Sequence, residues 1–240
     1  MENILIGCSG WFYPHWSGFF YPKEIPMREW FSYYASLFNT VELNSTFYSF
    51  PSVKRAERWY NESPKSFKYS IKMNRTITHT KRMVEVDDEM NKFYDAVSHL
   101  KEKLSSVLIQ LPPSFKYTKE NLNRISSSLR SETKEFFEFR HRSWYTPEAL
   151  NELRRMEIEI VAISFKDLPF FLPEQDDVYI RMHGNIYGYA TDYSEKTLME
   201  LATTLIDKNY RVTYVYFNND YNGYAPKNAL SLKKLLEKSY

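Results

Sequence analysis

The chain has 240 residues, of which 43% are hydrophobic and 18% aromatic, a composition that predicts a folded globular protein and excludes a disordered one. Thirty-two basic and 30 acidic side chains give a net charge of +2, which argues against a dedicated nucleic-acid-binding protein but allows a local basic patch. Cys8 is the only cysteine, the N-terminal run ILIGCSGW is too short for a signal sequence, and no segment approaches membrane-spanning length. We therefore expect a cytoplasmic protein with no internal disulfide and no membrane partner.

Short apolar runs alternate with amphipathic segments along the chain. The runs that predict strands are residues 4–9, 40–46, 67–73, 106–113, 135–141, 158–165, 177–184 and 211–219. Apolar residues recur at helical spacing in the segments between these runs. These segments begin at Pro26, near residue 52 (to 62), near residue 87 (to 104), at Leu122 (to Leu129), at Thr146 and Pro147, at Leu198 (to Leu205), and near Pro226. The sixth run leads instead into Pro169 and Pro173, so the sixth helix is predicted to be short or absent.

This alternation predicts an α/β fold, specifically a parallel (β/α)8 TIM-type barrel, which typically takes about 250 residues. An open doubly wound sheet is the alternative, but no glycine-rich phosphate turn follows the first strand. Neither a linker-like stretch nor an internal repeat interrupts the pattern. Residues 1–240 are therefore predicted to form a single domain.

The segment EFFEFRHRSW, residues 135–144, raises a question about buried charge. Side chains alternate between the two faces of a strand, so Phe137 and Phe139 share one face while Glu138 and Arg140 share the other. An isolated buried charge costs several kcal/mol or more. Glu138 and Arg140 are therefore expected to have partners on the other strands.

The same alternation turns polar groups of other strands toward the barrel interior, near the carboxyl ends where barrel enzymes place their active sites. The predicted set is Glu42, Asn44, Lys72, Gln110, Glu138, Arg140, Arg181 and His183, with His141 after the fifth strand and Asn218 and Asn219 ending the eighth. Its two carboxylates are outnumbered by three permanent cations, which favours an anionic substrate group such as phosphate or carboxylate. A self-satisfied ion-pair network without chemistry is the alternative.

Three connections are predicted to line the same rim. Residues 9–22, SGWFYPHWSGFFYP, include Trp11 and either stack on a base or sugar ring or form a hydrophobic plug. Residues 74–82, NRTITHTKR, carry His79 among basic side chains and are either part of the site or a solvated loop. Residues 218–229 end in a helix N-terminus, a position where barrels often bind phosphate.

Three other chemistries fit the sequence less well. Cys8 ends the first strand but has no adjacent base to activate it as a nucleophile. Lys72, Arg140 and Arg181 would repel a metal ion, so neither a metal nor another cofactor is expected. Glu42 and Glu138 lie three strands apart with arginine between them, which disfavours a glycosidase pair.

Seven segments, in this order, resemble the YecE-like family, a widespread domain of unknown function: GCSGWFYPHWSGFFYP, FNTVELNSTFYSFPS, ITH, LIQLPPSF, FEFRHRSW, RMHG and YVYFNNDYNGYAPKNA. The resemblance extends over nearly the whole chain and implies a parallel barrel of the triose-phosphate isomerase type, but it implies no reaction. The family's barrel has been likened to that of base-excision endonucleases, yet this chain lacks the crowded His, Asp and Glu residues of those metal nucleases. It also has Cys8 where many members have Thr or Ser.

Together these features predict a metal-independent hydrolase or lyase acting on an anionic small molecule with a phosphate and a ring. Glu138 is predicted as general acid or base, in a catalytic set with Lys72, His183 and Glu42. Arg140 and Arg181 are predicted to bind the anion, and Asn44, Gln110 and Asn218 to orient the ligand. Two alternatives remain open: a nucleic-acid-processing barrel that binds a short strand, and a non-catalytic ligand-binding protein. The oligomeric state is not predicted.

Overall fold

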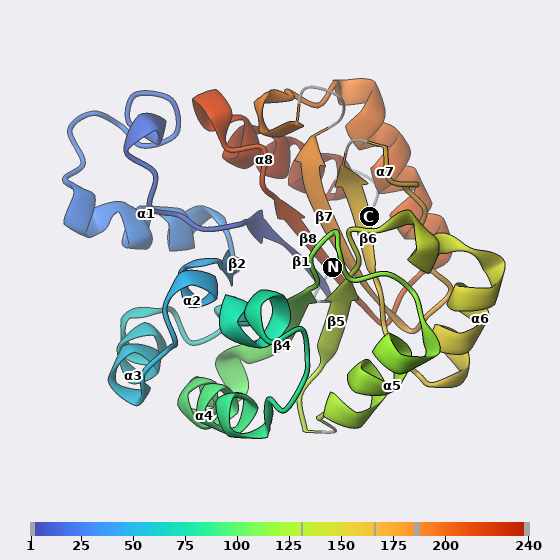
Figure 1. The fold of residues 1–240 in the computed structure, drawn as a ribbon. Coiled ribbons are helices and arrows are strands. Elements are labelled where there is room, and N and C mark those ends of the chain that lie inside the picture. The colour runs from blue at the N-terminus through green and yellow to red at the C-terminus, as the bar shows by residue number, and fades with distance from the viewer. Residues whose placement is uncertain (1–2, 131, 166, 185–187, 238–240) are drawn as a thin grey trace. The chain divides into compact units, whose positions relative to one another are not determined.

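Strands and helices alternate in the computed structural model, which describes residues 3–130, 132–165, 167–184 and 188–237 (Figure 1). The strands are β1 (Ile4–Cys8), β2 (Thr40–Leu43), β3 (Lys68–Lys72), β4 (Leu104–Gln110), β5 (Glu135–Glu138), β6 (Val161–Phe165), β7 (Asp177–Gly184) and β8 (Val212–Phe217). They form two four-stranded parallel sheets with the orders β1-β8-β7-β6 and β2-β3-β4-β5. The predicted α/β class is confirmed.

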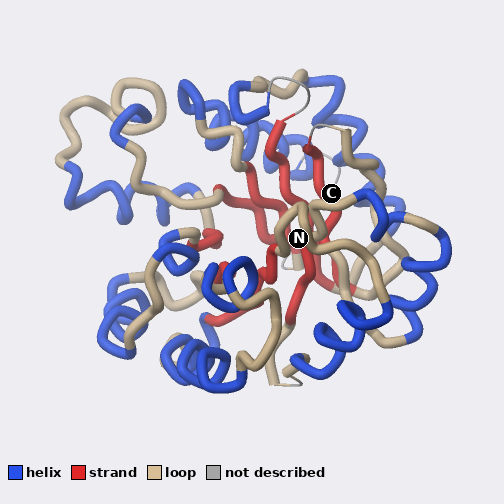
Figure 2. The backbone as a smooth tube through the Cα atoms, viewed as in Figure 1, coloured by secondary structure: helices blue, strands red, loops and turns tan. Residues whose placement is uncertain are grey.

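Helices follow most of the strands (Figure 2). The α-helices are α1 (Trp30–Leu37), α2 (Ser45–Tyr48), α3 (Val53–Glu62), α4 (Asp87–Ser98), α5 (Lys119–Ser128), α6 (Pro147–Arg155), α7 (Glu195–Lys208) and α8 (Tyr224–Glu237). Shorter turns are η1 (Pro14–Trp16), η2 (Met27–Glu29), the π-helix η3 (Thr76–Thr80), η4 (Lys101–Lys103), η5 (Arg142–Tyr145), η6 (Gly188–Ala190) and η7 (Tyr221–Gly223). None of the described helices is long and apolar enough to span a membrane.

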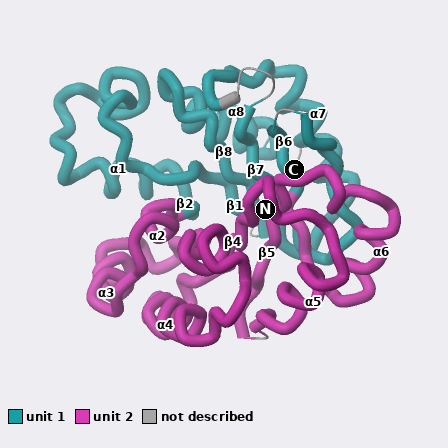
Figure 3. Tube along the Cα trace, viewed as in Figure 1, with its two compact units in different colours: residues 1–42, 162–240 teal, residues 43–161 magenta. Residues whose placement is uncertain are grey.

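The chain divides into two compact units (Figure 3). Unit 1 comprises residues 1–42 and 162–240, and unit 2 comprises residues 43–161. In unit 1, β8 pairs with β1 and β7, and α8 packs against β1 and β8. Gly7 of β1 is required there, because an added Cβ would lie 2.4 Å from the Thr40 carbonyl oxygen and 2.8 Å from the Tyr34 hydroxyl.

Unit 2 is built around β4, which pairs with β3 and β5. Beside β5, the ring of Trp144 stacks on Phe139 with centroids 4.1 Å apart and on Phe115 at 6.0 Å. The indole nitrogen of Trp144 donates to the Phe115 carbonyl oxygen at 2.7 Å. Phe137 and Phe139, the apolar residues on one face of residues 135–139, are buried beside this aromatic cluster.

Several element boundaries differ from the prediction for local backbone reasons. The helix predicted over 87–104 ends at Ser98, because Lys101 has a left-handed φ of 50° that a helix interior excludes, and Leu104 begins β4 instead. The strand predicted over 40–46 ends at Leu43, because Asn44 already has helical dihedrals. The strand predicted over 135–141 ends at Glu138.

The sixth connection agrees with its prediction. Residues 167–176, which lie between β6 and β7, contain no helix in the described part of the chain. Pro169 and Pro173 account for this, since proline lacks the N–H that a helix interior needs.

Candidate functional site

Three neighbouring strands of unit 2 each end on a polar residue. Lys72 ends β3, Gln110 ends β4, and Glu138 ends β5, with Gln110 directly opposite Glu138 in the ladder. The Lys72 ammonium donates to Gln110 Oε1 at 2.8 Å. The carboxyl ends of β3, β4 and β5 therefore carry a continuous polar row, as the alternation predicts.

Arg140 lies two residues beyond the end of β5 and turns back toward Glu138. Its Nε lies 2.5 Å from Glu138 Oε1, with 8% of the arginine side chain and none of the glutamate side chain exposed. A charge-assisted hydrogen bond of this kind compensates much of the cost of burying both groups. Glu138 and Arg140, the two charged residues that share one face of this segment, are thus partners of each other.

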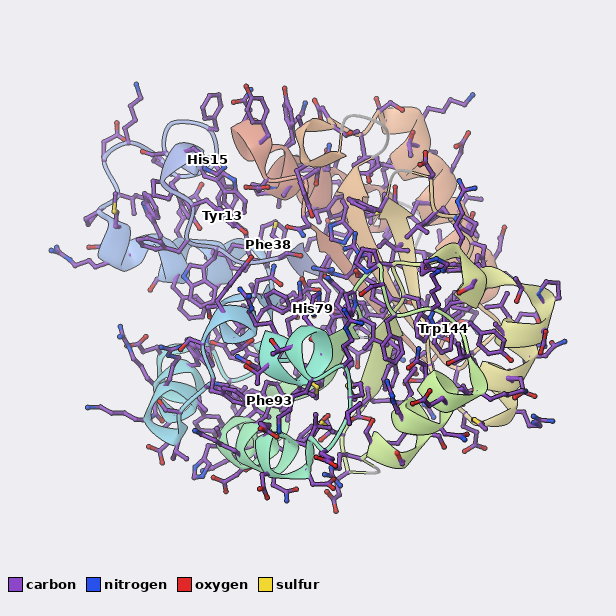
Figure 4. All side chains as sticks on the ribbon, in the orientation of Figure 1. Tyr13, His15, Phe38, His79, Phe93 and Trp144 are labelled. Carbon is purple, nitrogen blue, oxygen red and sulfur yellow. The ribbon has the colours of Figure 1, made fainter. Side chains whose placement is uncertain are left out.

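His79 and Phe47 border the ammonium of Lys72. The ammonium lies 4.2 Å from the centre of the Phe47 ring, and the His79 ring meets the same phenyl ring edge-on at 5.0 Å. Thr78 Oγ1 lies 2.9 Å from His79 Nδ1. His79, labelled in Figure 4, lies on the π-helix η3, a rare conformation that is frequent at functional sites.

Asn74 sets the start of this π-helix. Its side-chain amide donates to the Thr46 carbonyl oxygen at 2.8 Å and accepts from the Thr76 backbone N–H at 2.9 Å. Thr46 in turn donates from its hydroxyl to the Lys72 carbonyl oxygen at 2.6 Å. These buried bonds join α2, the end of β3 and η3, and they place His79 beside Lys72.

The electrostatic environment of His79 is dominated by cations. Burial lowers the pKa of His79 from 6.5 to about 4, with further lowering by Lys72, Arg75 and Arg140 and an opposing effect of Glu138. A neutral imidazole therefore lies among three positive side chains and one carboxylate. A site with this balance favours a bound anion.

Unit 1 contains a separate network around Glu42 and Arg181. Arg181 donates from Nε to Glu42 Oε2 at 2.8 Å and from Nη2 to Glu42 Oε1 at 2.6 Å. Tyr179 donates its phenol to Glu42 Oε2 at 2.7 Å. All three side chains are fully buried, so the carboxylate is held by an arginine fork and a tyrosine away from solvent.

His183 and the residues after β8 form a second polar group in unit 1. The amide nitrogen of Asn218 lies 3.0 Å from His183 Nδ1, and the imidazole lies beside the rings of Phe165 and Tyr189. Asn219 is fully buried, and its amide nitrogen donates to Asn228 Oδ1 at 2.7 Å and to the Thr191 carbonyl oxygen at 2.8 Å. Asn218 thus approaches the imidazole, while Asn219 fixes the loop.

The other predicted residues make local structural contacts. Asn44 precedes the first turn of α2. His141 caps η5 by accepting from the Ser143 backbone N–H at 3.1 Å. Trp11 packs against Phe31 with ring centroids 4.9 Å apart.

The comparisons with known proteins assign the family. A family model described as "Protein of unknown function DUF72" matches residues 5–240. The chain belongs to the DUF72 family. The UPF0759 protein YunF of Bacillus subtilis is 27% identical over 99% of this chain and 96% of its own length. The resemblance to the YecE-like family is thereby confirmed, since YecE of Escherichia coli K12 is 30% identical over 47% of this chain and 39% of its own.

The fold of this DUF72 chain is also similar to a solved structure. A crystal structure of a DUF72 family protein from Thermotoga maritima superposes with a TM-score of 0.87 at 30% identity, covering 98% of this chain and 99% of that one.

The structure describes the possible metal ligands and the single thiol of this DUF72 chain as follows. Among the described residues, no three or more His, Cys, Asp and Glu side chains gather closely enough to hold a metal ion. Cys8 is fully buried, and burial raises the pKa of its thiol well above the ordinary value. The reactive thiolate is therefore disfavoured.

Sequence reasoning missed Phe47 and Asn74 in unit 2, and His15 and Asp220 in unit 1. Asn74 lies two residues after the end of β3, a position that points to the carboxyl end of a strand. Phe47 has no polar atom to draw attention to it. His15 and Asp220 lie 205 residues apart, yet the His15 Nε2 is 2.9 Å from the Asp220 carbonyl oxygen. Only the folded chain brings that pair together.

Proposed function

We propose that this DUF72 protein is an enzyme that needs no metal ion and acts on an anionic, phosphate-bearing substrate at the carboxyl ends of β3, β4 and β5. The observation that carries the proposal is the surplus of positive charge around His79. Lys72, Arg75 and Arg140 act on this imidazole against the single carboxylate of Glu138. The same cations disfavour a divalent metal ion at this position, and they suit a hydrolase or lyase reaction of a phosphate-bearing substrate.

The roles follow from the contacts within unit 2. Arg140 and Lys72 would hold the anion, and Gln110 would orient Lys72 through its 2.8 Å hydrogen bond. An anion that draws Arg140 away from Glu138 would leave that carboxylate without its arginine and more basic. Glu138 would then act as the general base or acid, while the neutral imidazole of His79 supplies a hydrogen bond.

The unit 1 residues have a less direct part in this proposal. Arg181 is fully buried and bound at two points to Glu42, so contact with a substrate would require that pair to separate. We therefore assign anion binding to Arg140 and Lys72, and a supporting role to Glu42 and Arg181. His183, oriented by Asn218, stays a candidate for proton transfer.

Three broader predictions belong to the same proposal. Closure of the eight strands into one (β/α)8 barrel and a single-domain chain are supported by the regular alternation in the sequence. A cytoplasmic location is supported by the single cysteine, Cys8. Calorimetric unfolding tests the single-domain prediction, because one cooperative transition requires equal calorimetric and van't Hoff enthalpies.

The anion site is tested by thermal melting with phosphate and pyrophosphate. A ligand that binds the native state raises its melting temperature. We expect phosphate to stabilise wild type and Arg142→Gln, a control that removes an exposed arginine two residues away, but not Arg140→Gln. Equal stabilisation of all three proteins, or none in wild type, would contradict the proposal.

A second experiment distinguishes an enzyme from a ligand-binding protein and from a nucleic-acid-processing protein. Phosphorylated small molecules are incubated with wild type and Glu138→Gln, and release of inorganic phosphate or loss of substrate is followed by NMR. Turnover by wild type alone supports catalysis, whereas binding without turnover supports a ligand-binding protein. Tight binding of short oligonucleotides that weakens steeply with salt would instead support the nucleic-acid alternative.

A further inference from the structure

Unit 1 contains a cavity outside the anion site of the proposed function, although one of its lining residues, Tyr189, packs against His183 with ring centres 5.7 Å apart. It has a volume of about 530 Å³ and is lined by His15, Tyr189, Ala190, Asp220, Tyr221 and Asn222. Cavities that bind small ligands typically range from about 300 to 1,000 Å³. The lining residues come from the connections after β1, β7 and β8, which the structure brings together over the carboxyl ends of these strands.

His15 is held with one nitrogen turned to the protein. Its Nε2 lies 2.9 Å from the Asp220 carbonyl oxygen, and a carbonyl oxygen only accepts, so Nε2 carries the proton. In the neutral imidazole the other nitrogen, Nδ1, is then a hydrogen-bond acceptor. Within the part of the chain that the structure describes, Nδ1 has no hydrogen-bond partner. His15, labelled in Figure 4 on the connection after β1, therefore offers an acceptor at the cavity.

Asp220 contributes a second acceptor through its side chain. Its backbone carbonyl oxygen is engaged by Trp16 Nε1 at 2.9 Å as well as by His15. The carboxylate, 30% exposed, lies 3.6 Å from His15 Nε2 and lines the cavity. The backbone carbonyl oxygen of Asp220 thus holds the loop together. Its carboxylate, which also interacts with the backbone N–H of Asp220, keeps exposed surface at the cavity and can accept from a ligand there.

Two tyrosine rings border these acceptors. Tyr189 is 47% exposed and Tyr221 is 56% exposed, although both line a concave surface. A tight turn holds Tyr221 in place, because Asn222 and Gly223 both have left-handed dihedrals, with φ of 52° and 70°. Any other residue at 223 would be strained, because φ is 70° and an added Cβ would lie 3.1 Å from the Cβ of Phe19.

From these features we infer that the cavity is a binding site for a nucleobase, stacked on Tyr189 or Tyr221 and donating N–H groups to Asp220 and His15. Tyrosine rings stack on flat heterocycles, and two neighbouring acceptors select a ring edge that bears N–H donors. The carboxylate disfavours a phosphate group in contact with it. Guanine fits best, because its N1–H and one N2–H are adjacent donors that one carboxylate can accept together, and its second N2–H remains to donate to His15.

The inference is tested by calorimetric titration of the whole protein with guanosine, uridine and ribose. We expect guanosine to bind wild type more tightly than uridine, and ribose not to bind. Asp220→Asn keeps the backbone carbonyl oxygen that holds the loop, and it should weaken guanosine at least about tenfold, because one oxygen acceptor becomes a donor. Equal affinity of wild type and Asp220→Asn for guanosine would overturn the inference.

Tyrosine variants test the stacking. We expect Tyr221→Leu with Tyr189→Leu to weaken guanosine by about tenfold or more, and the matched phenylalanine substitutions to retain its affinity. Tyr48→Leu removes a tyrosine that is 73% exposed in unit 2 and serves as the control. The inference fails if wild type does not bind guanosine, or if the double leucine variant binds it as wild type does. This outcome is separate from the proposed function, which depends on Arg140 and phosphate.

Discussion

Glu42 and Arg181 form a two-point ion pair in which neither side chain has exposed surface. The two residues are 139 positions apart in the chain, and the contacts are 2.6 and 2.8 Å long. Removing one member of such a pair leaves an uncompensated charge in the interior, whereas replacing both is often tolerated. The pair therefore predicts a strong difference between single and double variants.

Glu42→Gln should lower the free energy of unfolding by about 3–5 kcal/mol, because the Arg181 guanidinium stays buried without its counter-charge. Glu42→Gln combined with Arg181→Met should recover most of this loss. Urea denaturation of the wild type and the two variants measures both effects. A double variant no more stable than Glu42→Gln would show that the ion pair is not the origin of the loss.

Glu138→Gln should be milder than Glu42→Gln, because the Arg140 side chain is 8% exposed whereas the Arg181 side chain has no exposed surface. We expect a loss of about 1–2 kcal/mol in the free energy of unfolding, within the range for a buried hydrogen-bond partner. Phosphate should still raise the melting temperature of this variant, since Arg140 is retained, while turnover of the eventual substrate is lost. A large loss of stability in Glu138→Gln, with no rise in melting temperature on adding phosphate to wild type or variant, would show that Glu138 and Arg140 are a structural pair.

His79 should titrate with a pKa of about 4, well below its ordinary 6.5, because it is buried beside Lys72, Arg75 and Arg140. Between these values the unfolded chain binds a proton at this histidine and the native protein does not. Its contribution to stability is therefore complete above pH 6.5 and is lost as the pH falls toward 4. NMR titration of the imidazole checks the value, and bound phosphate should raise it; a midpoint near 6.5 without phosphate would contradict the cationic environment.

Glu135, at the opposite end of β5 from Glu138, should have the reverse pH dependence. Burial raises its pKa to about 7, although Tyr94 and the Arg130 backbone N–H donate to the carboxylate. Between pH 4.5 and 7 the native carboxyl holds a proton that the unfolded chain has released, so stability falls as pH rises, by up to about 3 kcal/mol. Urea denaturation from pH 4 to 8 should show this slope in wild type and a flatter one in Glu135→Gln.

Cys8 should be unreactive in the native protein. Its side chain has no exposed surface, and burial raises the pKa of the thiol. A thiol reagent should label the protein only in denaturant. Rapid labelling at neutral pH without denaturant would show that the interior at the end of β1 opens readily.

The sequence by itself determined which segments become strands and which polar residues end them. The period of two in residues 135–138 places Phe137 in the aromatic cluster and Glu138 away from it, and the same period brings Lys72 and Gln110 to the ends of β3 and β4. Such patterns are local, since each side chain direction follows from backbone geometry within a few residues. The prolines after β6 likewise accounted for the missing helix.

Tertiary structure alone decided which polar groups meet. Arg181 and Glu138 look equivalent in the sequence, as single charges facing inward. Arg181 is bound without solvent contact by Glu42, which also accepts from Tyr179, while Glu138 binds the partly exposed Arg140. His15 and Asp220 lie near opposite ends of the chain and become neighbours only because β1 and β8 pair in parallel. Periodicity specifies the face of a strand, whereas the partner of a side chain depends on strand order and on the loops that follow, and these are properties of the whole fold.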